Sequence, residues 1–178
     1  MIVEKTKFKD LLIINHKIYN DERGAFTITY QSEILNNLLK KKVNFVQENK
    51  VYSKNRVLRG LHFQKNNYQQ AKLITVLKGN IFDVAVDIRK KSKTYGEYYS
   101  AVLSESDHKS LFIPRGFAHG YLTLTDEVIV SYRIDNIYSK EFEDGIPYDD
   151  QKLKINWNRF GNNFIISEKD KNWSDFKW

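Results

Sequence analysis

Apolar and polar residues alternate along several short stretches of this chain, and such alternation is typical of a β-strand with one buried face. Within Lys72–Arg89, every second residue from Phe82 to Ile88 is large and apolar. Val128–Ile134 repeats the same alternation. Four more stretches are strand candidates: Phe45–Tyr52, Tyr98–Leu103, Ser110–Ile113 and Gly120–Leu124. The pattern therefore predicts a protein built mostly from short strands.

The segments between these strands carry one turn signal and one helix signal. Gly79-Asn80 separates two strand-like runs and suits the two-residue turn of a hairpin. The apolar residues that follow Ser32 have helical spacing, which predicts one helix with Ser32 as its N-terminal cap. Lys40–Lys42 would fall at the C-terminal end of this helix, where cations interact favourably with the helix dipole.

The composition supports a globular, β-rich protein. Of the 178 residues, 41% are hydrophobic, 29% are charged and 14% are aromatic, and an enrichment in aromatic residues favours strands. Many short strands with little helix predict an antiparallel sandwich or barrel, and the length suits a single domain over residues 1–178. The chain has no cysteine, which excludes disulfides, zinc–thiolate sites and cysteine nucleophiles.

The formal net charge of +7 favours anionic partners such as nucleic acid, acidic lipid or a phosphorylated small molecule. The basic residues are interspersed with acidic ones rather than gathered in a stripe, so we do not expect nucleic-acid binding. The longest aliphatic run, Leu11–Ile14, is far shorter than a membrane span, and the N-terminus lacks the apolar core of a signal peptide. We therefore expect a soluble, cytoplasmic protein with no membrane partner.

The four histidines are the first candidates for chemistry. His16 and His108 have polar neighbours and are expected at the surface, whereas His62 and His119 lie in apolar, strand-like sequence. The Pro-x-Gly-x-x-His string that begins at Pro114 is similar to the second motif of metal-binding cupins, but the His-x-His pair of that site is missing. Two scattered histidines are too few to hold a first-row metal ion, so no metal site is expected.

An ordered series of motifs carries a resemblance to a known family. Three of them are specific: LRGLHFQ at Leu58–Gln64, DVAVDIR at Asp83–Arg89 and FIPRGFAHG at Phe112–Gly120. Further matching stretches extend in the same order from Arg23–Phe26 to Ser167–Asp170. In these residues the chain resembles the nucleotide-sugar 3,5-epimerases, typified by the enzyme that acts on dTDP-4-keto-6-deoxyglucose.

This resemblance implies an all-β, jelly-roll cupin fold and a homodimer that needs no metal or redox cofactor. It also implies a nucleoside-diphosphate 4-keto-6-deoxy sugar as substrate. In such a sugar the C–H bonds at C3 and C5 are acidic because each lies beside the carbonyl group. Inverting either carbon requires a base on one face, an acid on the other face and a stabilised enolate between them.

The resemblance assigns these roles to four residues. His62 matches the base, and Asp170 matches the carboxylate that would orient its imidazole. Lys72 matches the cation beside the C4 oxygen, where it would stabilise the enolate. Tyr132 matches the acid on the opposite face, and an unperturbed phenol is protonated at neutral pH.

The resemblance also implies substrate contacts from eight residues: Arg23, Phe26, Gln47, Asn49, Arg59, His119, Tyr138 and Lys169. The two arginines suit bidentate binding of the diphosphate. Arg59 and His62 have opposite strand parity, so both reach one pocket only if the chain bends between them. We expect a β-bulge at Gly60 for this reason.

Three departures from the family pattern fall outside the catalytic set. Ile28 replaces an acid that helps to recognise thymine, Lys65–Gln70 replaces a shorter loop, and Pro147-Tyr148 stands where Arg-Trp is usual. We therefore expect the same proton chemistry on a nucleotide-sugar that could carry GDP or CDP instead of dTDP, and a heptose instead of a hexose. Three further functions stay open: an epimerase that acts at C3 alone, a 3,4-ketoisomerase, and a non-catalytic cupin that binds sugar nucleotides.

Overall fold

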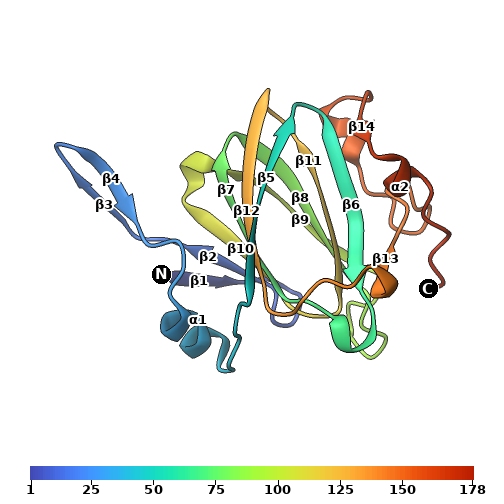
Figure 1. The fold of residues 1–178 in the computed structure, drawn as a ribbon, viewed down its shortest axis with the longest axis horizontal. Coiled ribbons are helices and arrows are strands. Elements are labelled where there is room, and N and C mark those ends of the chain that lie inside the picture. Colours follow the sequence, from blue (N-terminus) through green and yellow to red (C-terminus); the bar gives the residue numbers. More distant parts are fainter.

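Two antiparallel sheets face each other in the computed structural model, which describes residues 1–178 (Figure 1). In spatial order, the first sheet contains β1 (Ile2–Lys5), β2 (Leu12–Asn15), β10 (Lys109–Ile113), β7 (Lys72–Lys78), β12 (Glu127–Ile134) and β5 (Gln47–Lys54). The second contains β13 (Glu143–Gly145), β6 (Val57–Gln64), β11 (Phe117–Thr123), β8 (Asn80–Asp87) and β9 (Tyr98–Ser104), and β14 (Ile165–Ile166) pairs with β6 in parallel. The prediction of an all-β sandwich is confirmed.

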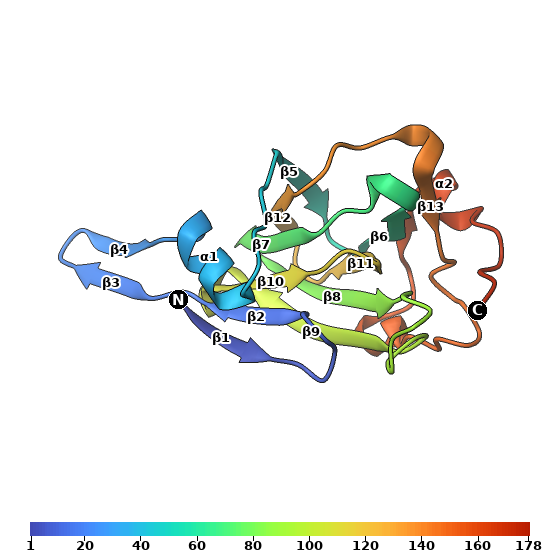
Figure 2. The same ribbon diagram turned by 90° about the horizontal axis from the view of Figure 1, so that it is seen from below.

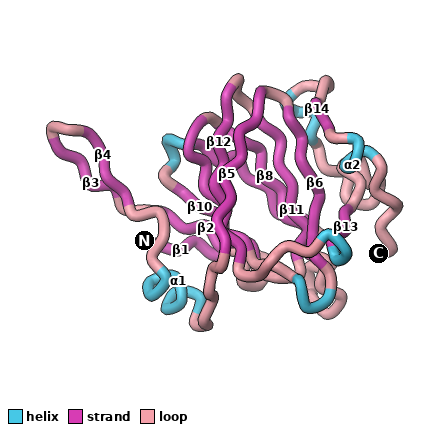
Figure 3. The backbone as a smooth tube through the Cα atoms, in the orientation of Figure 1, coloured by secondary structure: helices cyan, strands magenta, loops and turns pink.

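Helices are few and short in this fold (Figure 3). The α-helices are α1 (Ser32–Leu39) and α2 (Glu168–Lys171), and four 3₁₀ turns cover Asn66–Tyr68, Glu105–Asp107, Lys140–Phe142 and Trp157–Phe160. None of the helices has the length and the apolar character that crossing a membrane requires. Every strand candidate from the sequence overlaps at least one strand, although the ends differ by a few residues.

Helix α1 confirms the predicted helix but not its cap. Ser32 is the first helical residue, and the preceding Gln31 takes the capping position without a side-chain hydrogen bond. At the other end, Lys40 adopts a left-handed conformation with φ of 53°, which ends the helix. The lysine run therefore follows the helix rather than occupying its last turn.

The predicted Gly79-Asn80 hairpin is wrong, because the two strands that it joins belong to different sheets. β7 pairs with β10 and β12, whereas β8 pairs with β9 and β11. Gly79 has a φ of +74°, and a Cβ there would lie 2.4 Å from the carbonyl oxygen of Glu127. A glycine turn is a local signal, and here it turns the chain from one sheet into the other.

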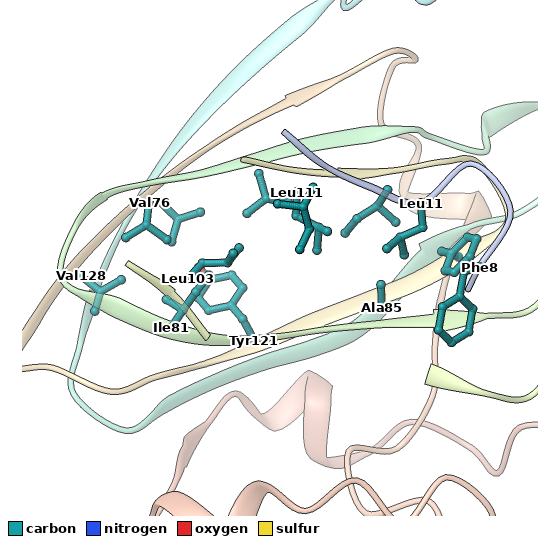
Figure 4. Packing of buried hydrophobic residues seen from close by; sticks show 14 residues of the cluster. Phe8, Leu11, Val76, Ile81, Ala85, Leu103, Leu111, Tyr121 and Val128 are labelled. Atoms are coloured by element: carbon teal, nitrogen blue, oxygen red, sulfur yellow. The ribbon is translucent and has the colours of Figure 1, made fainter. Parts of the chain in front are cut away.

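The core consists of three buried clusters, of which two lie on either side of the second sheet and the third joins α1 to the first sheet. Between the sheets lies a cluster that includes Leu11, Ile81, Leu111 and Tyr121 (Figure 4). The outer face of the second sheet is covered by the C-terminal part of the chain, where Trp157 contributes to a separate cluster. β8 is consequently buried on both faces.

The alternation in β8 therefore does not separate a buried face from a solvent-exposed face, because both faces are buried. Its large apolar residues, Phe82, Val84 and Val86, pack beneath the C-terminal segment. Ala85 faces the space between the sheets, and Asp83, which shares its parity, is also fully buried. The polar positions of this strand thus point toward the interior of the sandwich.

A two-stranded arm, β3 (Ile18–Asp21) and β4 (Gly24–Thr27), projects away from the two sheets (Figures 1 and 2). The two strands pair only with each other. His16 lies at the base of this arm, and it is buried rather than at the surface as expected from its polar neighbours. Its Nε2 atom lies 2.8 Å from Oγ of Ser110, on β10, so tertiary packing supplies the partner that the local sequence does not show.

Candidate active site

A cavity of about 430 Å³ opens between the two sheets. The first sheet contributes β5, β7 and β12 to its wall, and the second contributes β6, β11 and β13. Most of the lining residues are polar or charged, which suits a hydrophilic ligand. Ten of the twelve residues assigned from the sequence belong to this region: nine line the cavity directly, and Asp170 lies behind one of them.

His62 and Asp170 form a hydrogen-bonded pair, with 2.6 Å between Nε2 of the imidazole and Oδ1 of the carboxylate. The second carboxylate oxygen of Asp170 accepts a hydrogen bond from the amide of Gly60. Asp170 is buried, and burial alone would raise the pKa of its carboxyl group. The hydrogen bond and charge of His62, together with the Gly60 amide, outweigh burial and hold that pKa below its usual value. The carboxylate is therefore ionised and can orient the imidazole.

A β-bulge at Gly60 brings Arg59 and His62 into the same cavity, as the strand parity required. His62 is paired with His119 and Arg59 with Tyr121, so three steps along β6 oppose two steps along β11. Gly60 has a φ of +115°, and a Cβ there would lie 2.6 Å from the Cα of Gly120. No other residue fits this close approach of two backbones.

Lys72 lies in the cavity wall at the start of β7. Burial lowers the pKa of its ammonium group to about 8, while the nearby carboxylates of Asp83 and Glu143 oppose this shift. A cation in a poorly solvated place can interact strongly with a developing negative charge. Lys72 is thus a suitable partner for an oxyanion inside the cavity.

A second histidine–carboxylate pair lies beside the first. Nε2 of His119 is 3.0 and 2.9 Å from the two carboxylate oxygens of Asp83. Burial lowers the pKa of His119, and the charge and hydrogen bond of Asp83 act against burial. His119 was expected here from the sequence, whereas Asp83 was not assigned a role. The polar position of Asp83 among the apolar residues of its strand was the available signal.

Tyr132 reaches the cavity from β12, on the sheet opposite His62. Burial raises the pKa of its phenol above the usual value, so the hydroxyl stays protonated over the neutral range. The cavity therefore has an imidazole on one wall and a protonated phenol on the other, with the ammonium of Lys72 also in its lining.

The rim of the cavity carries a three-residue network. The carboxylate of Glu143 accepts a hydrogen bond from the Tyr138 hydroxyl at 2.9 Å and one from Nζ of Lys169 at 2.8 Å. Burial raises the pKa of Glu143, but its two hydrogen bonds prevail and lower it overall. Tyr138 and Lys169 were expected here from the sequence, whereas Glu143 was not assigned a role.

The remaining expected contacts divide into two groups. Gln47 and Asn49 lie together on β5, joined by a 2.7 Å hydrogen bond from Nε2 of Gln47 to Oδ1 of Asn49, and both line the cavity. Arg23 and Phe26 lie on the projecting arm and do not line the cavity of their own chain. Arg23 pairs instead with Asp21, and Phe26 is 63% exposed. No group of three or more His, Cys, Asp or Glu side chains is placed to hold a metal ion.

The whole chain is similar to proteins of one known family. The model of a family described as dTDP-4-dehydrorhamnose 3,5-epimerase matches residues 5–177. The dTDP-4-dehydrorhamnose 3,5-epimerase of Methanothermobacter thermautotrophicus is 46% identical over 176 residues, which cover 97% of this chain and 93% of that protein.

Solved structures agree with the sequence relatives. A dTDP-4-dehydrorhamnose 3,5-epimerase from Bacillus anthracis with TDP and PPi bound has a TM-score of 0.94 and 39% identity, covering 98% of this chain and 99% of that one. An epimerase from Legionella pneumophila in complex with dTDP-4-keto-L-rhamnose has a TM-score of 0.92 and 40% identity, covering 97% and 90%. A 3'-monoepimerase from Streptomyces bikiniensis has a TM-score of 0.89 at 23% identity and shares the fold alone. The fold by itself thus does not decide how many carbons are inverted.

Proposed function

Because this chain belongs to the dTDP-4-dehydrorhamnose 3,5-epimerase family and is an isomerase, we propose that it inverts C3 and C5 of a dTDP-linked 4-keto-6-deoxy sugar. One observation carries the proposal. A carboxylate-oriented imidazole and a protonated phenol come from opposite sheets into one cavity that an ammonium group also lines. A base and an acid on opposite walls are what the inversion of a carbon centre requires.

His62 acts as the base in this mechanism. Its Nε2–H donates to Asp170, which leaves Nδ1 as the basic nitrogen. Nδ1 removes the proton from the carbon beside the C4 carbonyl, and the electron pair of that C–H bond moves into an enolate. The ionised Asp170 stabilises the imidazolium that forms, and a positioned base of this kind contributes about 10²–10⁴-fold to the rate.

Lys72 and Tyr132 complete the step. The ammonium of Lys72 stabilises the negative charge on the C4 oxygen of the enolate. The Tyr132 hydroxyl then donates its proton to the carbon from the opposite face, and the configuration is inverted. The proton on His62 passes to solvent, and the Tyr132 phenolate takes a proton back, so that the enzyme returns to its starting state.

The relatives favour dTDP as the nucleotide. The Bacillus anthracis structure has TDP bound, and the Legionella pneumophila structure has dTDP-4-keto-L-rhamnose bound. The sequence-based options of GDP, CDP or a heptose receive no support from these relatives. Arg59 and Lys169 supply cations at the cavity for the diphosphate, and Gln47 and Asn49 supply amide groups for the sugar or the phosphates.

A homodimer would account for the position of the arm. Arg23 and Phe26 match substrate-binding positions of the family, yet the arm carries them away from their own cavity (Figure 1). Phe26 and Tyr19 on the arm are exposed apolar surfaces, 63% and 48% accessible. In a homodimer, the arm of one copy reaches the cavity of the other copy. Tyr19 and Phe26 are then covered by the second copy, and Arg23 and Phe26 supply the substrate contacts that its cavity lacks.

Isotope exchange tests the proposed function. The protein is incubated in D₂O with dTDP-4-keto-6-deoxyglucose, and H3 and H5 are followed by NMR. Loss of both signals with formation of the inverted sugar is the expected result, and loss of H3 alone would instead identify a C3-specific epimerase.

The same assay distinguishes an epimerase from a ketoisomerase and from a binding protein. A carbonyl found at C3 in the product would identify a ketoisomerase, and tight binding without exchange would identify a non-catalytic protein. Parallel incubations with the GDP- and CDP-linked sugars, and with a heptose, measure selectivity, and a faster reaction with any of them would overturn the assignment of substrate.

A further inference from the structure

Trp173 packs against the imidazole ring of His62. The rings of His62 and Trp173 have centroids 5.9 Å apart and an interplanar angle of 67°, an edge-to-face arrangement. Nζ of Lys169 also lies 5.7 Å from the centroid of the Trp173 ring. Trp173 is not among the residues that line the cavity. It therefore contacts a proposed catalytic side chain without being placed to touch the substrate.

The space for Trp173 exists because residue 145 is a glycine. Gly145 on β13 is the direct cross-strand neighbour of His62 on β6. A Cβ at Gly145 would lie only 2.3–2.5 Å from three atoms of the Trp173 ring system, a distance that no real contact shows. Gly145 has no positive φ, so its backbone would accept a side chain. The indole ring is what excludes one.

No hydrogen bond holds the indole in this place. The Nε1 atom of Trp173 is buried and has no hydrogen-bond partner, and buried polar atoms are normally paired. The ring thus lies where it contacts His62 and Gly145, and not where its N–H group would have a hydrogen-bond acceptor. This placement is consistent with a role that depends on the ring's shape.

We propose that Trp173 is a positioning residue for His62: seated in the space that Gly145 leaves open, it restricts the imidazole to the orientation in which Asp170 is its partner. This inference rests on the proposed function, because it takes His62 as the base. Misplacement of a reacting group by about 1 Å can reduce a rate about 100-fold. Lys169 also has the ion pair with Glu143, so removing the Trp173 ring should lower the rate and leave substrate binding largely unchanged.

Two substitutions perturb this contact independently. Trp173→Ala removes the ring, and Gly145→Ala displaces it. We expect each to lower kcat by about 10- to 100-fold with KM within about twofold, the signature of misplaced chemistry rather than lost binding. In the double variant the new methyl group has room, so its kcat should match that of Trp173→Ala alone. Such non-additivity reports direct contact between the two sites.

NMR gives a readout that does not depend on activity. The Trp173 ring current shifts the ring proton signals of His62, so both single variants should move those signals. Trp173→Phe keeps a ring and should retain more activity than Trp173→Ala. Trp178→Ala is the matched control, since Trp178 lies in the same C-terminal segment but packs on Phe176 and Tyr95, and it should keep kcat within about twofold.

Failure of the positioning role and failure of the proposed function give different results. Normal exchange by the unsubstituted enzyme with unchanged kcat in Trp173→Ala would overturn the positioning role alone. Equal losses in Trp173→Ala and Trp178→Ala would also overturn it, because they would show general loosening of the C-terminal segment. No exchange by the unsubstituted enzyme would overturn the proposed function, and with it any role of Trp173 in that reaction. If Trp173→Ala fails to fold, Trp173→Phe and Gly145→Ala carry the test.

Discussion

Nε2 of His62 lies 2.6 Å from Oδ1 of Asp170, although 108 positions separate the two residues in the chain. Asp170 is held for this contact by α2, whose capping residue Ser167 accepts a hydrogen bond from the Asp170 amide. The C-terminal segment thus delivers a carboxylate to a histidine on β6.

Asp170→Asn should lower the rate of exchange at C3 and C5 by about 10²–10⁴-fold, because the amide neither fixes the imidazole tautomer nor stabilises the imidazolium. The NMR exchange assay measures this rate. Asp175→Asn, an exposed change in the same segment, should leave it unchanged. Exchange by Asp170→Asn at the parent rate would remove Asp170 from the mechanism.

Activity should fall as the pH rises through about 8. The pKa of Lys72 is lowered to about 8, so the ammonium that stabilises the enolate is present below that pH and is lost above it. The phenol of Tyr132 has a raised pKa and stays protonated in this range. We therefore expect Lys72 to produce the alkaline limb of the kcat/KM profile, which reports the groups of the free enzyme.

Lys72→Arg tests this assignment, because a guanidinium remains charged far above pH 8. The variant should be less active but should lack the alkaline limb near pH 8. Lys72→Met should lose activity by about 10²–10³-fold below pH 8, which is the usual loss when a single oxyanion-stabilising group is removed. Its difference from the parent should shrink above pH 8, where the parent ammonium is itself lost. An alkaline limb that persists in Lys72→Arg would show that a different group titrates.

Tyr132→Phe should separate proton removal from inversion. His62 can still take the proton and return a deuteron on the same face, so washout of H3 or H5 should continue while the inverted product falls by about 100-fold or more. NMR of the product distinguishes the two outcomes in one sample. Tyr52→Phe, which changes an exposed tyrosine of β5, serves as the control. Parent-level inversion by Tyr132→Phe would contradict its role as the acid.

Asp87 should contribute to stability and not to catalysis. It is fully buried and accepts hydrogen bonds from Arg89, Ser92 and Thr94. Burial raises its pKa, but these bonds prevail and lower the pKa to about 2. Breaking such a buried network by Asp87→Asn should reduce the free energy of unfolding by about 3 kcal/mol at pH 7, as measured by urea denaturation.

The stabilisation by Asp87 should depend on pH in a defined direction. Its pKa is about 2 in the folded state and about 3.9 in an unfolded chain. The stabilising effect is complete above about pH 4 and is lost as the pH falls through about 2. The difference in stability between the parent and Asp87→Asn should therefore shrink between pH 4 and pH 2, and a constant difference would contradict this account.

Mixed dimers test the proposed arm exchange. Phe26→Ala should raise KM with little change in kcat, and His62→Asn should abolish exchange. If the arm of one copy completes the cavity of the other, a heterodimer of these two variants contains one intact site and should show the parent KM. Parent-like KM in Phe26→Ala, or a monomer by light scattering, would argue against the exchange.

Much of the architecture was accessible from the sequence because it depends on short-range patterns. Short apolar stretches, two of them with clear alternation, identified the strands β5 and β7 to β12. Parity along β6 predicted the bulge at Gly60 that the structure shows. The ordered motifs pointed to the family that the comparisons establish. Each of these signals is contained within a strand or a turn.

Only the tertiary structure decided how the pieces meet. It separated β7 from β8 across Gly79, turned the polar face of β8 inward, buried His16 against Ser110, and placed Trp173 over Gly145. Which strands pair depends on how well the two faces of each sheet are buried. That burial is supplied by segments far away in the chain. Residue types and spacing therefore determined which groups were available for catalysis, and long-range packing determined which of them came within reach of one another.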